Sequence, residues 1–379
     1  MKKWCKAVLF ILPLLCMVAA VNWYVDSYAY LRVTYDQIGR KMAEESMNVT
    51  GLEESDFNDR NLFLSYIKRQ KEPRELIVAG SSRVMNFDHT MFDTDSFYNA
   101  GLSESTIYDL LAVAGALEQH GQLPEKMIVG VDAFLFNKSH DNDRWKELEA
   151  YACYMADRLG YDITNVNELE TEHKAERGGA FGRTASMPQN NTGRDYTKLF
   201  SLDYFRYNVT CLPQRRRFLV DYTDEWETEG YLKHYDGSIA YQRELREVEL
   251  TQVEELTNAS MEEHVVYRMT DYHEIDGQSM GLLEALTVYL QGRGVEVMLY
   301  LPPYSPMMYN YIESEEQFQI TFQVEEQVRQ MAARTGAALY GSYDPAGCGL
   351  EMTDLYDIYH VKTEKMPDTF YPADRSGIQ

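Results

Sequence analysis

A serine in this sequence stands where it could act as a nucleophile. Ser82 follows the short apolar run 76–79 and Gly80, in the way that a buried strand ends at a turn. A hydroxyl at such a turn can be exposed, and the backbone amides beside it can stabilise an oxyanion. An ordinary capped turn is the alternative interpretation of Gly80-Ser81-Ser82, because serine favours helix N-caps.

A segment near the C-terminus supplies a carboxylate and an imidazole. Asp357 lies three residues before His360, and positions i and i+3 of a helical turn share a face. Asp357 could hold the imidazole through one nitrogen while the other nitrogen takes the proton of a serine hydroxyl. Asp354 is a second candidate for the orienting carboxylate. The residue types predict nucleophilic catalysis by Ser82, His360 and Asp357.

A parallel sheet would bring these residues together, because functional groups collect at the C-terminal ends of its strands. Apolar runs that alternate with helical patterns predict such a sheet, with right-handed crossovers. We therefore expect an α/β fold with a three-layer parallel sheet. The expected strands are 76–79, 98–101, 127–131, 295–301 and 337–340, and the expected helices are 103–120, capped by Ser103 or Ser105, 144–159, 277–292 and 315–335.

The pattern divides the rest of the chain into segments. Residues 27–70 are polar and predict a stalk or cover, whereas 71–139 and 266–379 predict the two parts of the core. The alternation disappears between 140 and 265, which predicts a large insertion. An insertion beside strand ends can be a lid or an acceptor-binding surface, and a decorative loop domain is the alternative.

Residues 1–26 predict a cytoplasmic tip and a transmembrane signal anchor. Three lysines precede the apolar run 7–21, and Trp23 and Tyr24 suit the outer membrane interface. A cleaved signal peptide is the alternative, although Ala19-Ala20-Val21 is not followed by a clean small-x-small site. Both interpretations export the remaining residues, so we expect a single-pass cell-membrane protein whose main domain is extracytoplasmic.

Composition argues against several partners. The formal charge of -24 and the absence of a basic stripe argue against nucleic acid. The clusters 140–143 and 273–276 contain metal-ligand residue types without a recognised ligand spacing, so we predict no metal. No phosphate loop or dinucleotide fingerprint follows a strand, and we predict no cofactor.

Four short motifs occur in order along the chain. They are Gly80-Ser81-Ser82, Asn99-Ala100-Gly101, Gly130-Val131-Asp132 and Asp357-Ile358-Tyr359-His360. This series resembles the SGNH/GDSL hydrolase superfamily, and is most similar to DltD-type and alginate O-acetyltransferase-like cell-surface acylation proteins. The resemblance covers about 74–136 and 277–366, and it implies a flavodoxin-like (SGNH-type) sheet with Ser82 as the nucleophile. It also implies an oxyanion or substrate-binding site formed by Gly101, Asn99 and Asp132.

Two departures from that family pattern matter. The third motif normally supplies an Asn to the oxyanion site, whereas this chain has Asp132, whose ionised carboxylate would repel an oxyanion. Losing one such donor typically costs about 100- to 1000-fold in rate. Ser81 replaces the usual Asp, as is common among the surface-acylation relatives. Arg83 could hold a carboxylate or sugar group, and a surface salt bridge is the expected alternative.

The resemblance implies a serine O-acyltransferase or esterase that acts on a cell-envelope glycan through an acyl-Ser82 intermediate. It also implies a membrane-bound O-acyltransferase as a partner that delivers the acyl group. Two alternatives remain. One is a noncatalytic glycan-binding or scaffold protein, which Asp132 favours, and the other is a secreted lipase or carbohydrate esterase that acts alone.

Overall fold

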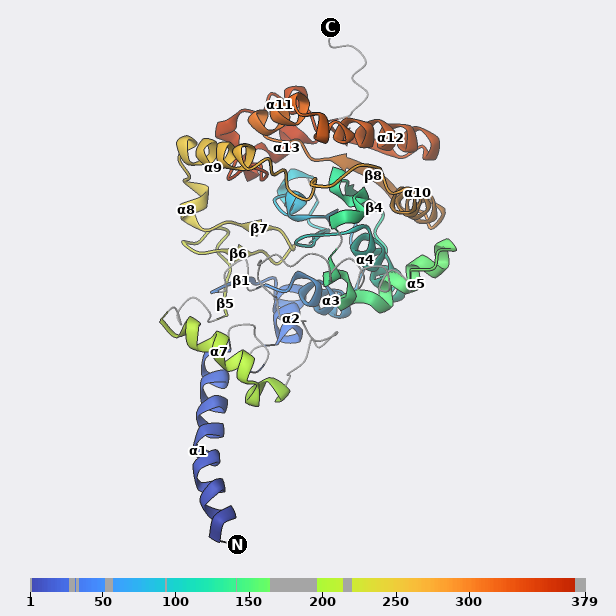
Figure 1. Cartoon of the computed structure of the whole chain (residues 1–379). Coiled ribbons are helices and arrows are strands. Elements are labelled where there is room, and N and C mark those ends of the chain that lie inside the picture. The colour runs from blue at the N-terminus through green and yellow to red at the C-terminus, as the bar shows by residue number, and fades with distance from the viewer. Residues whose placement is uncertain are drawn as a thin grey trace. The chain divides into compact units, whose positions relative to one another are not determined.

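The computed structural model describes residues 2–26, 31, 34–51, 57–92, 94–140, 142–163, 196–213 and 220–371. The chain divides into two compact units, and Figure 1 labels many of their helices and strands. The first unit contains Met1–Gln70, Asn190–Tyr235 and Ile239–Arg243, and the second contains Lys71–Gln189, Asp236–Ser238 and Glu244–Gln379. The first unit therefore draws on both the predicted stalk and the predicted insertion.

The second unit contains a five-stranded parallel sheet with the order β3-β2-β4-β8-β9. Its inner strands form because short apolar runs are buried on both faces, as every residue of β2 is, whereas the edge strand β9 is partly exposed. The sheet confirms the predicted α/β class, and each of its strands overlaps one of the expected strands. The strands are β2 Leu76–Gly80, β3 Phe97–Gly101, β4 Lys126–Gly130, β8 Glu296–Leu301 and β9 Ala338–Gly341.

The helices of this unit follow the predicted alternation, with corrections at their ends. The cap of α4 is Thr106 rather than Ser103 or Ser105, because Thr106 and Asp109 form a reciprocal capping box. The expected helix 315–335 begins only at Ile320, after a 3-10 turn. The helices are α4 Ile107–Gln119, α5 Glu149–Leu159, α9 Leu250–Glu262, α10 Gly277–Gly292, α11 Pro306–Ser314, α12 Ile320–Thr335 and α13 Met366–Thr369, and α8 Arg243–Arg246 spans the unit boundary.

The first unit holds a second, antiparallel sheet that the sequence did not predict. Its order is β5-β1-β6-β7, and its strands have only two or three residues, too few to show an alternating pattern. The strands are β1 Asn48–Thr50, β5 Asp221–Thr223, β6 Leu232–Lys233 and β7 Ile239–Ala240. The helices are α1 Lys2–Val25, α2 Tyr35–Glu45, α3 Asp59–Arg69 and α7 Leu202–Cys211.

None of the helices in the described part of the chain combines the length and apolar character that crossing a bilayer requires.

Both candidate catalytic segments are fixed to the same hydrophobic core in the second unit. Val84 and Phe87, which follow Ser82, are buried there together with Leu355 and Val361, which lie before and after the Asp357–His360 segment. Phe87 also packs edge-on against Tyr300 of β8, with ring centroids 5.1 Å apart. Because a close-packed core tolerates little displacement, it holds the two segments at a set separation.

Candidate active site

The structure brings Ser82, His360 and Asp357 into one hydrogen-bonded series. His360 Nε2 lies 2.8 Å from Ser82 Oγ, and His360 Nδ1 lies 2.8 Å from Asp357 Oδ2. An ionised carboxylate can only accept, so Nδ1 carries the ring proton and Nε2 accepts the hydrogen of the Ser82 hydroxyl. This geometry suits a nucleophile, a general base and an orienting carboxylate.

The surroundings of Asp357 keep its carboxylate ionised. Its Oδ1 accepts hydrogen bonds from the N–H groups of Tyr359 (2.8 Å) and His360 (2.9 Å). Burial raises the pKa of Asp357, but the His360 imidazole and these amides outweigh burial and hold the pKa below its ordinary value. The other candidate, Asp354, instead accepts the N–H of Glu351 through Oδ2 at 2.9 Å.

A closed turn presents the imidazole. Leu355 and Val361 form an antiparallel bridge, and the Tyr356 N–H donates to the His360 carbonyl at 2.8 Å. Lys362 N–H donates to the carbonyl of Asp354, also at 2.8 Å. These bonds close the chain on itself, so Asp357 and His360 face each other across the loop.

Two glycines position the serine. Ser82 begins a 3-10 turn directly after β2, where Gly80 has φ +156°, a conformation that L side chains rarely adopt. A Cβ on Gly80 would lie 3.0 Å from a methyl carbon of Val84, and one on Gly130 would lie 2.5 Å from the other methyl carbon. Val84 therefore needs both glycines in order to pack over the strand ends. Ser81, not Ser82, caps the turn by accepting the Arg83 N–H at 3.2 Å.

Asn86, which sequence reasoning did not select, joins the serine and histidine segments. Its buried amide Nδ2 donates to the carbonyl of Val361 at 2.9 Å. Val361 is the residue after His360, so this bond sets the height of the imidazole relative to the Ser82 turn. Asn86 touches neither reacting side chain in the described contacts, and we regard it as a positioning residue.

Asn99 and Gly101 lie beside the serine turn, but they bond each other. The Asn99 amide donates to the carbonyls of Val84 (2.8 Å) and Phe87 (2.9 Å), and its oxygen accepts the Gly101 N–H at 2.9 Å. Asn99 therefore supports the turn, and the glycine amide expected at the oxyanion site is already engaged. The Ser82 N–H makes no hydrogen bond to the residues that the structure describes.

Arg83 and Asp132 form a buried ion pair, so the expectation of a surface salt bridge for Arg83 was wrong. Arg83 Nη1 donates to Asp132 Oδ1 at 2.9 Å, and the two side chains are 6% and 0% exposed. Arg83 Nη2 also donates to the carbonyls of Pro302 (2.9 Å) and Pro303 (2.6 Å). The guanidinium lies 4.7 Å from the ring centroid of Tyr304. The Asp132 carboxylate thus faces a cation.

The Arg83 guanidinium remains charged, although it is taken out of water. Burial lowers the pKa of Arg83, but Asp132 and the neighbouring Tyr304 and Tyr300 together outweigh burial and raise the pKa above its ordinary value. Two buried atoms, Arg83 Nε and Asp132 Oδ2, have no hydrogen-bond partner among the described residues. The two formal charges of the pair cancel, so the Asp132 carboxylate should repel an oxyanion less than a lone carboxylate would.

Aromatic side chains line the region next to the histidine turn. The hydroxyl oxygen of Tyr359 accepts the N–H of Tyr267 at 2.9 Å, and Tyr267 packs edge-on against Phe134. Arg268 lies over both Tyr267 and Phe134 and pairs with Glu104 at 3.1 Å. Glu104 and Arg268 both have positive φ, 55° and 57°, a conformation often found near functional sites.

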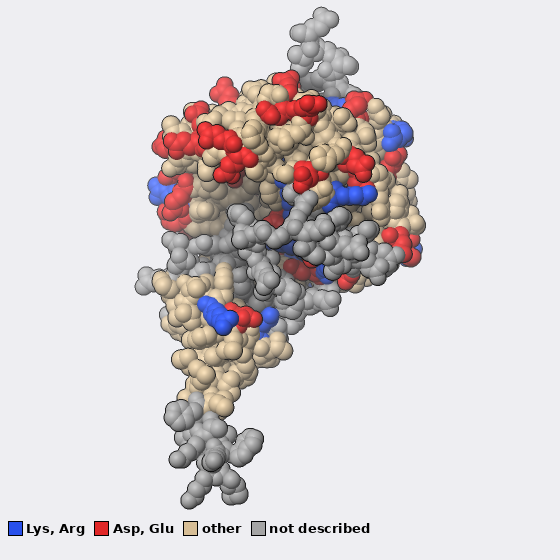
Figure 2. Space-filling model, in the orientation of Figure 1, with Lys and Arg blue, Asp and Glu red and all other residues tan. Residues whose placement is uncertain are grey.

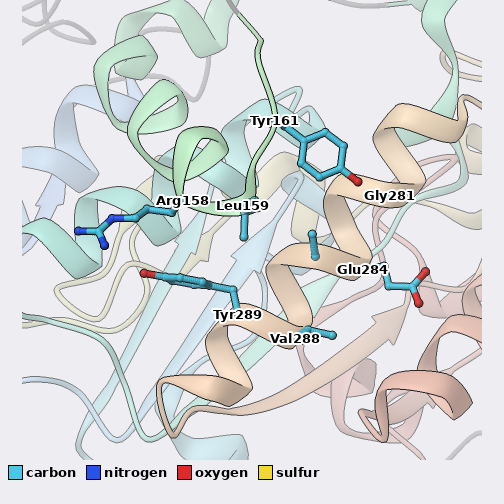
Figure 3. Close-up of a pocket in the computed structure, with 8 residues that line it drawn as sticks. Arg158, Leu159, Tyr161, Gly281, Glu284, Val288 and Tyr289 are labelled. Carbon is cyan, nitrogen blue, oxygen red and sulfur yellow. The ribbon is translucent and has the colours of Figure 1, made fainter.

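A separate hollow of about 460 Å³ opens between α5 and α10, and Figure 3 shows its lining. It is lined by Arg158, Leu159, Tyr161, Gly281, Glu284, Ala285, Val288 and Tyr289, and contains none of the residues selected from the sequence. Among the described residues no group of three or more His, Cys, Asp or Glu side chains could hold a metal ion. The Asp141 position of one acidic cluster lies outside the described residues.

No protein-family model matches this chain, and no curated protein matches it.

Proposed function

We propose that this protein is an extracytoplasmic serine O-acyltransferase or esterase of the SGNH type, acting on a cell-envelope glycan. The observation that carries the proposal is the hydrogen-bonded series from Asp357 through His360 to Ser82. Ser82 and His360 are 278 residues apart in sequence. The capped-turn interpretation accounts for Ser81, which caps, but leaves the contact of Ser82 with His360 unexplained.

The reaction divides into two transfers. As Ser82 Oγ attacks the acyl carbonyl, its proton moves to His360 Nε2, and Asp357 stabilises the imidazolium. The tetrahedral intermediate collapses, the bond to the leaving oxygen breaks, and His360 gives that oxygen the proton. A glycan hydroxyl or water then loses its proton to His360 and attacks the acyl-Ser82 ester. The acyl group leaves on the acceptor, and the proton returns to Ser82.

In both transfers negative charge develops on the acyl carbonyl oxygen, and hydrogen-bond donors are needed to stabilise it. The Ser82 N–H is available for this role. A substrate oxygen would compete with Asn99 Oδ1 for the Gly101 N–H, which is bonded at 2.9 Å without substrate. The Arg83–Asp132 pair adds no net negative charge beside the serine, so the departure at Asp132 is compatible with catalysis.

The proposal also includes the type of fold and the attachment to the membrane. The strand order β3-β2-β4-β8-β9 is compatible with a three-layer, flavodoxin-like arrangement of the SGNH type. The apolar run 7–21, with lysines before it, supports attachment to the cell membrane by the N-terminal segment. A membrane-bound O-acyltransferase that supplies acyl groups is a partner that the family resemblance alone suggests.

A noncatalytic glycan-binding protein is the second candidate. The engaged Gly101 N–H and the carboxylate at position 132 favour it, because each removes an oxyanion donor that the family pattern would provide. Losing such donors slows acyl transfer by about 100- to 1000-fold for each one. A protein with the same fold could then bind glycan without turning it over.

Ester hydrolysis by the full chain in detergent separates the two candidates. Release of nitrophenol from a short-chain aryl ester should be abolished in Ser82→Ala and His360→Ala, and retained in Asp354→Asn. Asp354 is a matched control because it lies in the same turn and does not touch the imidazole. Esterase activity that persists in a folded Ser82→Ala variant would contradict the proposal. No activity in the parent chain, toward the aryl ester or an acetylated oligosaccharide, would favour the binding protein.

A further inference from the structure

Helix α7, Leu202–Cys211, presents three different faces around its axis. Successive residues turn by about 100°, so residues three, four and seven apart share a face. One face is buried, a second is exposed and apolar, and a third is exposed and polar. Such a division is unusual for a helix that only covers a core, which needs one buried face and one polar face.

The buried face attaches α7 to the C-terminal end of α1. The hydroxyl of Tyr204 donates to Asp26 Oδ1 at 2.9 Å, and Asn208 Nδ2 donates to Asn22 Oδ1 at 3.0 Å. Cys211 is buried in a small cluster with Val25. Figure 1 shows α7 lying across this end of α1. The attachment fixes the direction in which the other two faces point.

The apolar exposed face runs the length of the helix. Leu202 is 59% exposed and Val209 41% exposed, and Leu212 is exposed directly after the helix. Phe205, at the intervening helical position, is half-buried. No charged residue occupies this stripe. Apolar area of this kind in water is unfavourable, which indicates that something covers it.

The polar exposed face lies alongside. It carries Asp203, Arg206 and Thr210, and Asp203 and Arg206 form an exposed ion pair at 3.5 Å. The pair leaves this face without net charge. A helix with one apolar and one hydrated face beside each other can lie in the plane of a lipid–water interface.

The neighbouring surface has the composition of a membrane interface. The 3-10 turn before α7, Tyr196–Phe200, exposes its two terminal aromatic rings, and Asn22 Nδ2 of α1 bonds the carbonyls of Lys198 and Leu199. Trp23 and Tyr24 of α1 are exposed at the same end. Aromatic residues of this type concentrate where acyl chains meet headgroups. In Figure 2 a small group of blue and red side chains lies on the upper part of the lower, tan region, and the tan surface below it shows no other charged side chain.

We propose that the segment from Tyr196 to Leu212 is a second membrane-contacting element, lying in the phospholipid headgroup and acyl boundary beside α1. Its apolar stripe enters the lipid, and the Asp203–Arg206 face stays in water. The contact requires that α1 and α7 share one interface, and it is independent of how deeply α1 enters the bilayer. It would hold the first unit at a set height on the membrane.

Tryptophan quenching in the full chain tests this placement. Val209→Trp puts a reporter on the apolar stripe, and Thr210→Trp puts one on the polar face, one residue away. Both variants would be reconstituted in phosphatidylcholine vesicles, with and without brominated acyl chains. A zwitterionic lipid is chosen because the chain's charge of -24 would be repelled by anionic lipid. The fluorescence of the parent chain is subtracted.

The proposal predicts that bromination quenches the added fluorescence at position 209 at least about twofold more than at position 210. Equal quenching at both positions would overturn the proposed orientation. No quenching at either, as expected if a second copy or another protein covered the stripe, would overturn the membrane contact itself. Unfolding midpoints equal to that of the parent show that each variant is folded. Neither outcome depends on Ser82, so failure here leaves the acyl-transfer proposal standing.

Discussion

Replacing Asp132 with asparagine tests whether that carboxylate serves to balance Arg83. The side chain is 0% exposed, and its Oδ1 lies 2.9 Å from Arg83 Nη1. Asparagine has the same shape and can keep an oxygen at that place, but it removes the negative charge. The guanidinium would then be a buried cation held only by neutral acceptors, including the carbonyls of Pro302 and Pro303.

Although asparagine has the same shape as aspartate, Asp132→Asn should lower the free energy of unfolding substantially. Breaking a buried ion pair by removing one partner costs about 3–5 kcal/mol, and we expect about 3 kcal/mol because asparagine keeps one hydrogen bond. For a domain of about 150–250 residues each kcal/mol lowers Tm by about 2–4 °C, so Asp132→Asn should lower Tm by about 6–12 °C.

Thermal unfolding of the full chain in detergent measures this cost. Glu284→Gln is the control, since Glu284 pairs with Arg334 at 2.8 Å on the surface, where such pairs contribute little. The double variant Arg83→Met, Asp132→Asn removes both charges, and should be more stable than Asp132→Asn alone.

An Asp132→Asn protein that unfolds within about 2 °C of the parent would refute the buried-pair reasoning. Esterase activity gives a second readout. If the variant became more active with unchanged Tm, Asp132 would be a defect in an oxyanion site rather than the counterion of Arg83.

Three further changes have defined outcomes. Asp357→Asn removes the acceptor that fixes the ring tautomer of His360, and kcat should fall on the order of 10³- to 10⁴-fold. Asn86→Ala removes the bond to the Val361 carbonyl, and should lower kcat by about 10- to 100-fold with KM unchanged, because it misplaces the imidazole without touching substrate. His89 donates to Asp236, and this bond, against the effect of burial, raises the pKa of His89. The bond therefore stabilises the fold fully at a pH below the unfolded-state pKa of about 6.5, and this stabilisation is lost as pH rises through the higher pKa of the folded state. The Tm difference between the parent and His89→Gln should shrink with rising pH.

Each of these expectations has a contradicting result. Activity in Asp357→Asn within about tenfold of the parent would exclude an orienting role for that carboxylate. A change in KM alone in Asn86→Ala would mean that Asn86 acts on substrate binding. A Tm difference for His89→Gln that grows between pH 6 and pH 8 would reverse the sign assigned to the ion pair with Asp236.

The parallel sheet could be predicted because its signal is local. The run 76–79 is apolar throughout, and 295–301 is apolar apart from Glu296, as expected of strands buried on both faces. The bounds of α10, Gly277–Gly292, agree with the expected helix for the same reason, since glycines stand at both ends and apolar residues recur between them. The N-cap of α4 was harder to predict, because Ser103, Ser105 and Thr106 are all good N-cap residues. Only Thr106 has an acidic residue, Asp109, three residues further on to complete a capping box.

The antiparallel sheet could not be predicted from local pattern. It pairs β1, near residue 50, with β5 and β6, near 222 and 232, in strands of two or three residues. Nothing in so short a run distinguishes a strand from a loop. Its stability comes from pairing over long sequence separations, which a single sequence does not reveal.

The candidate site was partly predictable. The spacing of Asp357 and His360 implied their contact, whereas the partner of Arg83 was not found. A signal did exist: Arg83 follows β2 and Asp132 follows β4, and these strands are neighbours in the sheet. Opposite charges just beyond the ends of adjacent parallel strands are candidates for pairing. Asn86 gave no comparable signal, because its partner is a backbone carbonyl.

The most direct test of the central claim is to trap the acyl-enzyme. The full chain would be mixed with an activated acyl ester, quenched in acid within one turnover, digested, and mapped by mass spectrometry. The account predicts an added acyl mass on Ser82, absent from Ser82→Ala and short-lived in the parent, but formed far more slowly in His360→Ala. No acyl adduct, or an adduct on Ser81 or elsewhere that is unchanged in Ser82→Ala, would contradict the assignment of Ser82 as the nucleophile.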